Sequence, residues 1–145
     1  MKKKSKISKI LLRVPNWIGD AVMSLPALDE LSALYEGASI TVLAKPWTAP
    51  VFVNNPNVAS IIEYDSNGVH KGLLGRIALA RELRKIGFDM AVLFQNAFDA
   101  AFISFLAGIP RRIGFARDLR SPLLTYAIEI SKDIMKQHQG FYYIN

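Results

Sequence analysis

One acidic side chain stands where it could act as a general base. Asp20 ends the segment Pro15-Asn16-Trp17-Ile18-Gly19-Asp20, which follows an apolar run at residues 10–14. A carboxylate in such a place can take a proton from an attacking hydroxyl. An aspartate at the start of a helix can also cap it by accepting backbone N–H groups. The local sequence leaves both roles open for Asp20.

Other residues that could bind a substrate follow further apolar runs. The two tryptophans, Trp17 and Trp47, either pack against the protein or stack on a sugar ring. A group of arginines either forms a solvated basic face or recognises carboxylate and phosphate through paired hydrogen bonds. The candidate binding residues are Asn16, Trp17, Lys45, Trp47, Asn96, Arg112, Arg117 and Arg120.

Several kinds of site are not expected. The chain has no cysteine, which excludes disulfides, thiolate metal sites and a thiol nucleophile. The histidines, His70 and His138, are too few and too far apart to indicate a metal site. The single glycine in residues 15–20 differs from the G-x-G-x-x-G of a dinucleotide site and from a P-loop. We therefore expect no metal ion.

The elements that must position these residues alternate between apolar strands and amphipathic helices. Near-continuous apolar strands indicate a parallel sheet covered on both faces, so we expect an α/β, Rossmann-like, doubly wound and mostly parallel sheet. Ligands bind such sheets beyond the carboxyl ends of the strands. The expected strands are 10–14, 39–44, 59–64, 88–94, 112–115 and about 127–130; the expected helices are 20–34, 73–86, 97–107 and one from about 138, with a short helix or turn at 48–53.

Two of these helices carry specific expectations. Pro26 falls inside the helix predicted over 20–34 and should either kink this helix or limit hydrogen bonding in its early turns. The helix predicted over 73–86 has one apolar side and should end at Gly87. That side consists of Leu73, Ile77, Ala80, Leu83 and Ile86.

The net charge of +6 favours anionic partners. Residues 1–8 are rich in lysine, and we interpret them as a basic flexible tail before one domain at 9–145. This tail is either solvated or attracted to an anionic membrane. Arg13, Pro15 and Asp20 interrupt the apolar stretch that a signal peptide needs, so we expect a cytoplasmic protein, with a peripheral membrane position as the open alternative. No aromatic and basic residues interleave as base-stacking requires, so we expect no nucleic-acid partner.

Several motifs together resemble one family. Residues 15–20, followed by Ser24-Leu25-Pro26-Ala27-Leu28, resemble the N-terminal motif of ADP-heptose:lipopolysaccharide heptosyltransferases, glycosyltransferase family 9. The segments 43–47, 95–98 and 107–115 are similar to later parts of that motif series. The tryptophan before Ile18-Gly19-Asp20 is more similar to type II than to type I enzymes.

The resemblance implies an inverting glycosyltransferase of two Rossmann-like domains (GT-B), which transfers heptose from ADP-heptose to the inner core of lipopolysaccharide without a cofactor. Asp20 would be the catalytic base, and the arginines would face acceptor carboxylates and phosphates. Residues 9–145 would be the N-terminal, acceptor-side domain, and a C-terminal domain would hold most of the donor.

Gly19 would be donor-proximal, because glycine lets a backbone N–H approach a diphosphate. We expect the 145 residues alone to be inactive. The alternative is a non-catalytic anion- or nucleotide-binding Rossmann-like module.

Overall fold

A parallel sheet of six strands forms the centre of the protein. The computed structural model describes residues 7–94, 98–115 and 126–128. The strands are β1 (Lys9–Arg13), β2 (Ser39–Ala44), β3 (Ser60–Glu63), β4 (Met90–Leu93), β5 (Arg111–Phe115) and β6 (Tyr126–Ile128). They lie in the order β3-β2-β1-β4-β5-β6, and every neighbouring pair is parallel. This confirms the predicted doubly wound sheet, whose strand order reverses between β1 and β4.

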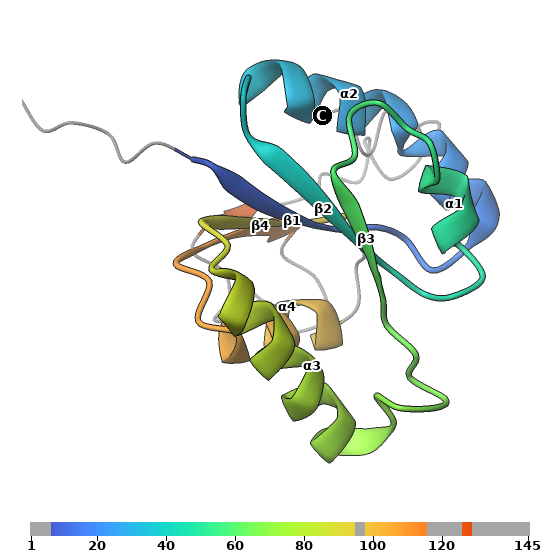
Figure 1. The fold of residues 1–145 in the computed structure, drawn as a ribbon, viewed down its shortest axis with the longest axis vertical. Helices are drawn as coiled ribbons and strands as arrows, with labels where there is room; N and C mark the ends of the chain where they lie inside the picture. Colours follow the sequence, from blue (N-terminus) through green and yellow to red (C-terminus); the bar gives the residue numbers. More distant parts are fainter. Residues whose placement is uncertain (1–6, 95–97, 116–125, 129–145) are drawn as a thin grey trace, which may run out of the picture.

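Helices cover both faces of the sheet (Figure 1). On one face lie α1 (Ile18–Met23), α2 (Leu25–Leu34) and the short 3₁₀ helix η1 (Ala49–Phe52); on the other lie α3 (Gly72–Ile86) and α4 (Phe98–Leu106). Alternate residues of β1 belong to two separate cores, Ile10 and Leu12 to the α1–α2 side and Leu11 to the α3–α4 side. The uninterrupted apolar strands are therefore explained by burial on both faces.

The prediction of one continuous helix over residues 20–34 is wrong. The chain forms two helices there, α1 and α2, and α1 begins at Ile18, two residues earlier than expected. Pro26 lies in the first turn of α2, where its missing N–H costs no helical hydrogen bond. Ser24 separates the two helices, and its hydroxyl donates to the carbonyl oxygen of Ala21 at 2.6 Å. The proline therefore starts a helix and does not kink one.

The helix predicted over 73–86 is confirmed in extent, since α3 runs from Gly72 to Ile86. Gly87 ends it with φ 78°, a left-handed conformation that glycine adopts without strain. The predicted apolar side is only partly buried, because Leu73 and Ile86 are exposed. The residues that α3 buries are Gly75, Leu79, Ala80 and Leu83. No helix in the described residues is long and apolar enough to cross a membrane.

Candidate functional site

Asp20 lies in the first turn of α1, just beyond the carboxyl end of β1. The N-cap of α1 is Trp17, with φ −103° and ψ 137°, and it makes no side-chain capping hydrogen bond. The interpretation of Asp20 as the residue that caps this helix is therefore wrong. The first turn still gives the partly buried carboxylate a favourable position, because the positive end of the helix dipole stabilises a negative charge.

The loop before Asp20 is held by a side chain of β1 and by one from the turn after β2. Arg13 is only 1% exposed at the end of β1. Its Nη1 donates to the carbonyl oxygen of Val14 and its Nη2 to Oδ1 of Asn16, both at 2.6 Å. Trp47, which follows β2, donates from Nε1 to the carbonyl oxygen of Asn16 at 2.6 Å. Asn16 is thus fixed by both its side chain and its backbone.

Lys45 brings a second buried cation to the same edge of the sheet. It is 7% exposed, and its Nζ lies 4.1 Å from the centroid of the Tyr64 ring and 5.8 Å from that of Trp47. Its Nζ also donates to Oγ of Ser66. The guanidinium of Arg13 lies 5.6 Å from the same Tyr64 ring. A buried charge is costly unless it is compensated, and contact with aromatic rings offsets part of that cost.

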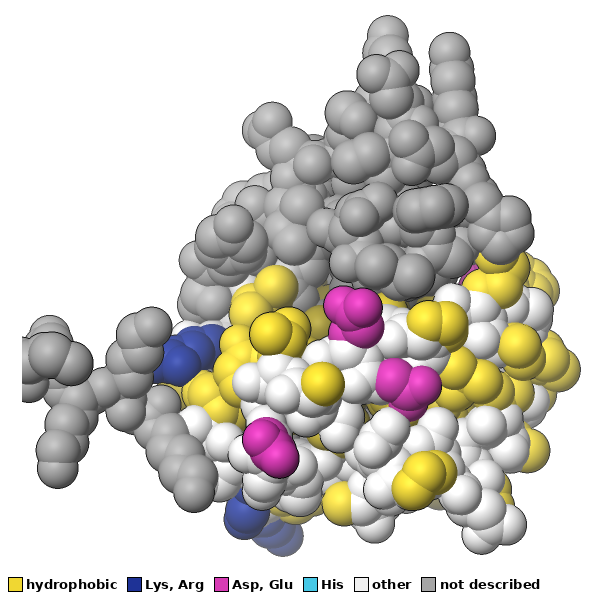
Figure 2. Space-filling model, turned by 90° about the horizontal axis from the view of Figure 1, so that it is seen from above, with side chains coloured by type: hydrophobic (Ala, Val, Ile, Leu, Met, Phe, Trp, Pro, Cys, Tyr) yellow, Lys and Arg dark blue, Asp and Glu magenta, His cyan; other side chains and the backbone are white. Residues whose placement is uncertain are grey.

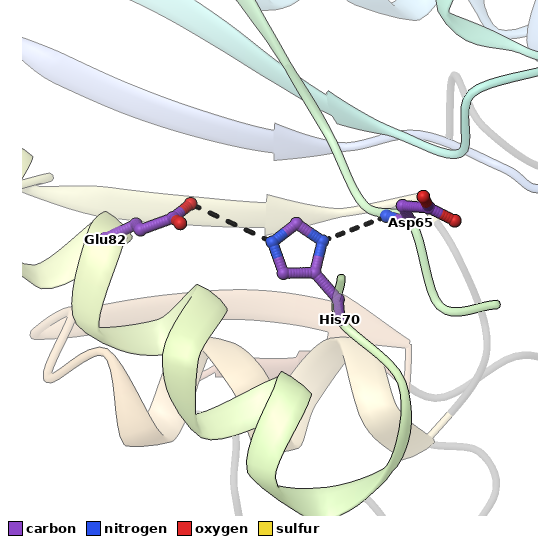
Figure 3. Close-up of polar contacts among 3 residues, drawn as sticks. All are labelled: Asp65, His70 and Glu82. Carbon is purple, nitrogen blue, oxygen red and sulfur yellow. Dashed lines mark hydrogen bonds and ion pairs between the residues drawn. The ribbon is translucent and has the colours of Figure 1, made fainter. Parts of the chain in front are cut away.

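His70 links the loop after β3 to α3 (Figure 3). Its Nδ1 accepts a hydrogen bond from the backbone N–H of Asp65 at 3.0 Å. Its Nε2 lies 3.9 Å from Oε2 of Glu82 on α3, and its ring centroid lies 5.9 Å from that of Tyr64. Since Nδ1 accepts, the proton of the neutral ring sits on Nε2 and faces Glu82. The loop is therefore tied both to the helix and to the residues around Lys45.

Six of the candidate residues lie just after β1 and β2. Asn16, Trp17, Lys45 and Trp47 are on the loops, whereas Gly19 and Asp20 are in the first turn of α1; Trp17 is 73% exposed. A Cβ atom added at Gly19 would meet no heavy atom within 4 Å, so this glycine faces open space. Indole and backbone surface at this edge is therefore accessible to a ligand.

The structure does not bring Arg112 to this edge. Arg112 is the second residue of β5, at the amino end of the strand. Its Nη1 donates to the carbonyl oxygen of Ile109 at 2.5 Å, and its guanidinium lies 5.2 Å from the Phe105 ring. Three other candidates, Asn96, Arg117 and Arg120, lie outside the described residues.

Sequence reasoning missed four residues that support this edge, the buried Arg13, Tyr64 and His70 and the partly buried Ser66. Arg13 offered a signal, because a charged side chain inside a buried apolar strand needs a specific partner. His70 and Ser66 offered none. Among the residues that the structure describes, no group of histidine and acidic side chains could hold a metal ion.

A parallel sheet in this order, with polar side chains at its carboxyl edge, defines a Rossmann-like ligand-binding domain. Residues 76–139 match glycosyltransferase family 9 (heptosyltransferase). The chain is 34% identical over 125 residues to lipopolysaccharide heptosyltransferase 2 of Salmonella typhimurium, a match that covers 86% of the chain and 36% of that relative. The chain carries a glycosyltransferase family 9 domain, and the family resemblance is confirmed.

Solved structures show the same fold. A family 9 glycosyltransferase from Veillonella parvula superposes with a TM-score of 0.85 at 22% identity and covers 99% of this chain and 41% of its own. The ADP-heptose lipopolysaccharide heptosyltransferase II of Escherichia coli superposes with a TM-score of 0.75 at 32% identity, and the match covers 87% of this chain and 36% of that protein. The chain thus spans little more than a third of the relatives it matches. Since these relatives are glycosyltransferases, the alternative of a non-catalytic module is not favoured.

Proposed function

We propose that the full gene product containing these 145 residues transfers heptose from ADP-heptose to the inner core of lipopolysaccharide. The names of the relatives support the donor and the acceptor. The observation that carries the proposal is the position of Asp20. It stands in the first turn of α1, after a loop that Arg13 and Trp47 fix through Asn16.

Asp20 acts as the general base of this reaction. Its carboxylate takes the proton of an acceptor hydroxyl while the hydroxyl oxygen forms a bond to the anomeric carbon of the heptose. The bond from that carbon to the diphosphate oxygen breaks, ADP leaves, and the anomeric configuration is inverted. The step needs neither a metal ion nor a cofactor, and we propose none.

The acceptor lies along the carboxyl edge of the sheet. Lys45 places positive charge there for acceptor carboxylates and phosphates, and Asn16, Trp17 and Trp47 line the same edge. Gly19 is the donor-proximal residue, because the space beside it leaves room for a diphosphate. Asn96, Arg117 and Arg120 stay in the proposal as acceptor residues. Arg112 does not, because its guanidinium binds the carbonyl of Ile109.

The proposed acceptor is linked to lipid, so we place the enzyme in the cytoplasm at the inner face of the inner membrane. The net charge of +6 supports contact with an anionic surface. We propose no nucleic-acid partner.

Replacement of the base tests the mechanism. In the full gene product, Asp20→Asn should lower kcat for transfer from ADP-heptose to isolated inner-core acceptor by about a hundredfold or more, as loss of general base catalysis does. The matched control is Glu30→Gln, which neutralises an exposed carboxylate on α2 and should leave kcat unchanged. Turnover of Asp20→Asn near the wild-type rate would remove Asp20 from the role of general base. Absence of transfer by the wild type would refute the proposed transfer of heptose from ADP-heptose to this acceptor.

The 145 residues alone should give no transfer, because the match covers only 36% of lipopolysaccharide heptosyltransferase 2. Turnover of ADP-heptose by the isolated chain would contradict this expectation.

A further inference from the structure

Three aliphatic side chains around the start of α3 are exposed. Val69 is 77% exposed, Leu73 58% and Leu74 82%. With Lys71, also exposed, they form what we call the α3 tip (Val69, Lys71, Leu73 and Leu74). Exposed aliphatic side chains in contact with water are unfavourable, and a cluster of them rimmed by charge marks a contact surface.

The tip is held in place by buried neighbours. His70, between Val69 and Lys71, is 7% exposed and points inward to the Asp65 N–H and to Glu82 (Figure 3). The backbone N–H of His70 donates to the carbonyl oxygen of Asp65 at 2.9 Å. The backbone N–H of Gly68 also donates to the carbonyl oxygen of Asp65, at 3.1 Å, so the loop is anchored on both sides of Val69 and the outward direction of the tip is a property of the fold.

The exposed stripe of α3 continues the tip with positive charge. Leu74, Ala78, Arg81 and Lys85 are all exposed and are spaced four, three and four residues apart, so they share one side of the helix. Residues 70–88 contain five basic side chains and one acidic side chain. A helix with apolar and basic residues on its outer face suits the boundary of an anionic lipid bilayer.

The opposite side of the molecule carries the opposite charge. Residues 14–44, which include α1 and α2, contain four acidic side chains and no lysine or arginine. Figure 2, which views the molecule from the α2 side, shows acidic side chains among neutral and hydrophobic ones, with basic side chains only toward one side. The beginning of α3 lies across the sheet from α2 (Figure 1). An anionic surface would therefore attract the α3 side and repel the α2 side.

The tip is also joined to the candidate site. The rings of His70 and Tyr64 lie 5.9 Å apart, and Ser66 of the same loop accepts a hydrogen bond from Lys45. A membrane that contacts the tip would bring a lipid-linked acceptor close to the loops that carry Lys45 and Trp47.

We propose that the α3 tip inserts into the boundary of an anionic lipid membrane while Arg81 and Lys85 contact the headgroups. The use of this contact, to bring a lipid-linked acceptor to the enzyme, rests on the proposed function. The contact itself is measured without any sugar, so the two can fail separately.

Vesicle flotation of the 145-residue chain tests the proposal. The chain should bind vesicles of phosphatidylethanolamine with phosphatidylglycerol more strongly than vesicles of phosphatidylcholine alone, and added salt should weaken binding. The double variant Leu73→Ser/Leu74→Ser should lower the partition coefficient about tenfold or more, because two leucines no longer leave water. Arg81→Gln/Lys85→Gln should lower it about fivefold for each charge, on anionic vesicles only.

The matched control is Leu34→Ser, which removes a leucine that is 76% exposed on α2 and should leave partition unchanged. Circular dichroism and thermal unfolding should show that the exposed substitutions leave the fold intact. A second variant that changes Lys2, Lys3, Lys4 and Lys6 to Gln separates the basic tail from the tip.

Three results would overturn the proposal. The first is wild-type binding no stronger to anionic than to neutral vesicles. The second is loss of binding in the tail variant while Leu73→Ser/Leu74→Ser binds like the wild type. The third is a dimer in sedimentation that Leu73→Ser/Leu74→Ser dissociates, which would assign the tip to a second copy of the chain.

Discussion

At the level of single residues, Arg13 is a charged side chain that is only 1% exposed. Its guanidinium is buried at the end of β1 and makes its hydrogen bonds to the chain that follows, at Val14 and Asn16. Arginine suits this place because its planar group presents several donors in fixed directions. The loop that leads to Asp20 thus depends on a residue that belongs to the strand.

Arg13→Lys should destabilise the protein although it keeps the charge. An ammonium cannot reproduce both hydrogen bonds, and bonds from a charged donor contribute about 1.5–3 kcal/mol, so we expect a loss of about 2 kcal/mol in the free energy of unfolding. Urea denaturation measures this loss, and amide hydrogen exchange should rise at residues 16–20.

The control for Arg13→Lys is Arg81→Lys, which makes the same change at an exposed position on α3 and should alter stability by less than about 0.5 kcal/mol. Equal effects of the two substitutions would show that Arg13 does not hold the loop.

Gly19 separates stability from function. Its added Cβ meets nothing within 4 Å, so Gly19→Ala should leave the free energy of unfolding unchanged or raise it by up to about 1 kcal/mol through helix propensity. In the full gene product, the methyl group should displace the donor and lower the rate of heptose transfer about tenfold or more. A variant with normal stability and normal transfer would remove Gly19 from the donor site.

At the level of elements, α3 and the loop before it are packed more closely than any side chain allows. A Cβ at Gly75 would lie 2.1 Å from the carbonyl carbon of His70 and 2.4 Å from its oxygen, which are backbone atoms. The first turns of α3 therefore rest directly on the loop that carries His70. Glycine is required here for space and not for an unusual backbone conformation.

Gly75→Ala should force the loop and α3 apart. Overpacking costs about 1–3 kcal/mol, which exceeds the gain of at most about 1 kcal/mol in helix propensity, so we expect a net loss of roughly 2 kcal/mol because the clash is with backbone. Urea denaturation measures it, and Gly19→Ala, which adds the same methyl group in open space, is the control. Unchanged stability would mean that the loop moves away without cost, and the α3 tip would then lack its support.

The elements were largely predictable from sequence, and the contacts between them were not. Apolar runs such as Ser39–Ala44 predicted the strands because parallel strands are buried on both faces. The break at Ser24 was not expected, because a proline inside an apolar pattern either kinks a helix or starts a new one. Leu73 was placed on the buried side of α3 because periodicity identifies an apolar side and not what covers it.

The candidate site divides in the same way. Asp20, Lys45 and Trp47 could be predicted because residues that follow parallel strands meet at one edge of the sheet. The contacts of Lys45 with Tyr64 and Ser66 could not, because they depend on the register of β2 with β3 and on the path of a loop. Arg112 was a wrong candidate for this edge for the same reason. It lies near the amino end of β5, because the strand begins at Arg111, and residues there lie at the opposite end of the sheet.

At the level of the whole molecule, the carboxyl and amino edges of the sheet differ in what they hold. The carboxyl edge carries Asp20, Lys45 and Trp47, whereas contacts at the amino edge hold β1 to its neighbour β4. There the carboxylate of Asp89, just before β4, accepts the backbone N–H groups of Ser8 at 2.8 Å and Lys9 at 3.0 Å. These two hydrogen bonds lower the pKa of Asp89 below its ordinary value, and the bond from Ser8 has the larger effect.

This lowered pKa predicts a pH-dependent contribution to stability. Asp89 stabilises the folded protein fully above the ordinary aspartate pKa of the unfolded chain, and this contribution is lost as the pH falls through the lower pKa of the folded state. Relative to Asp89→Ala, the wild type should be about 1 kcal/mol more stable at neutral pH, a small value because the site is partly open to water. Urea denaturation of both proteins across the acidic range measures the difference. It should shrink toward acidic pH, since other titrating groups affect both proteins alike, and a difference that stays constant would show that the charge of Asp89 does not hold β1 to the sheet.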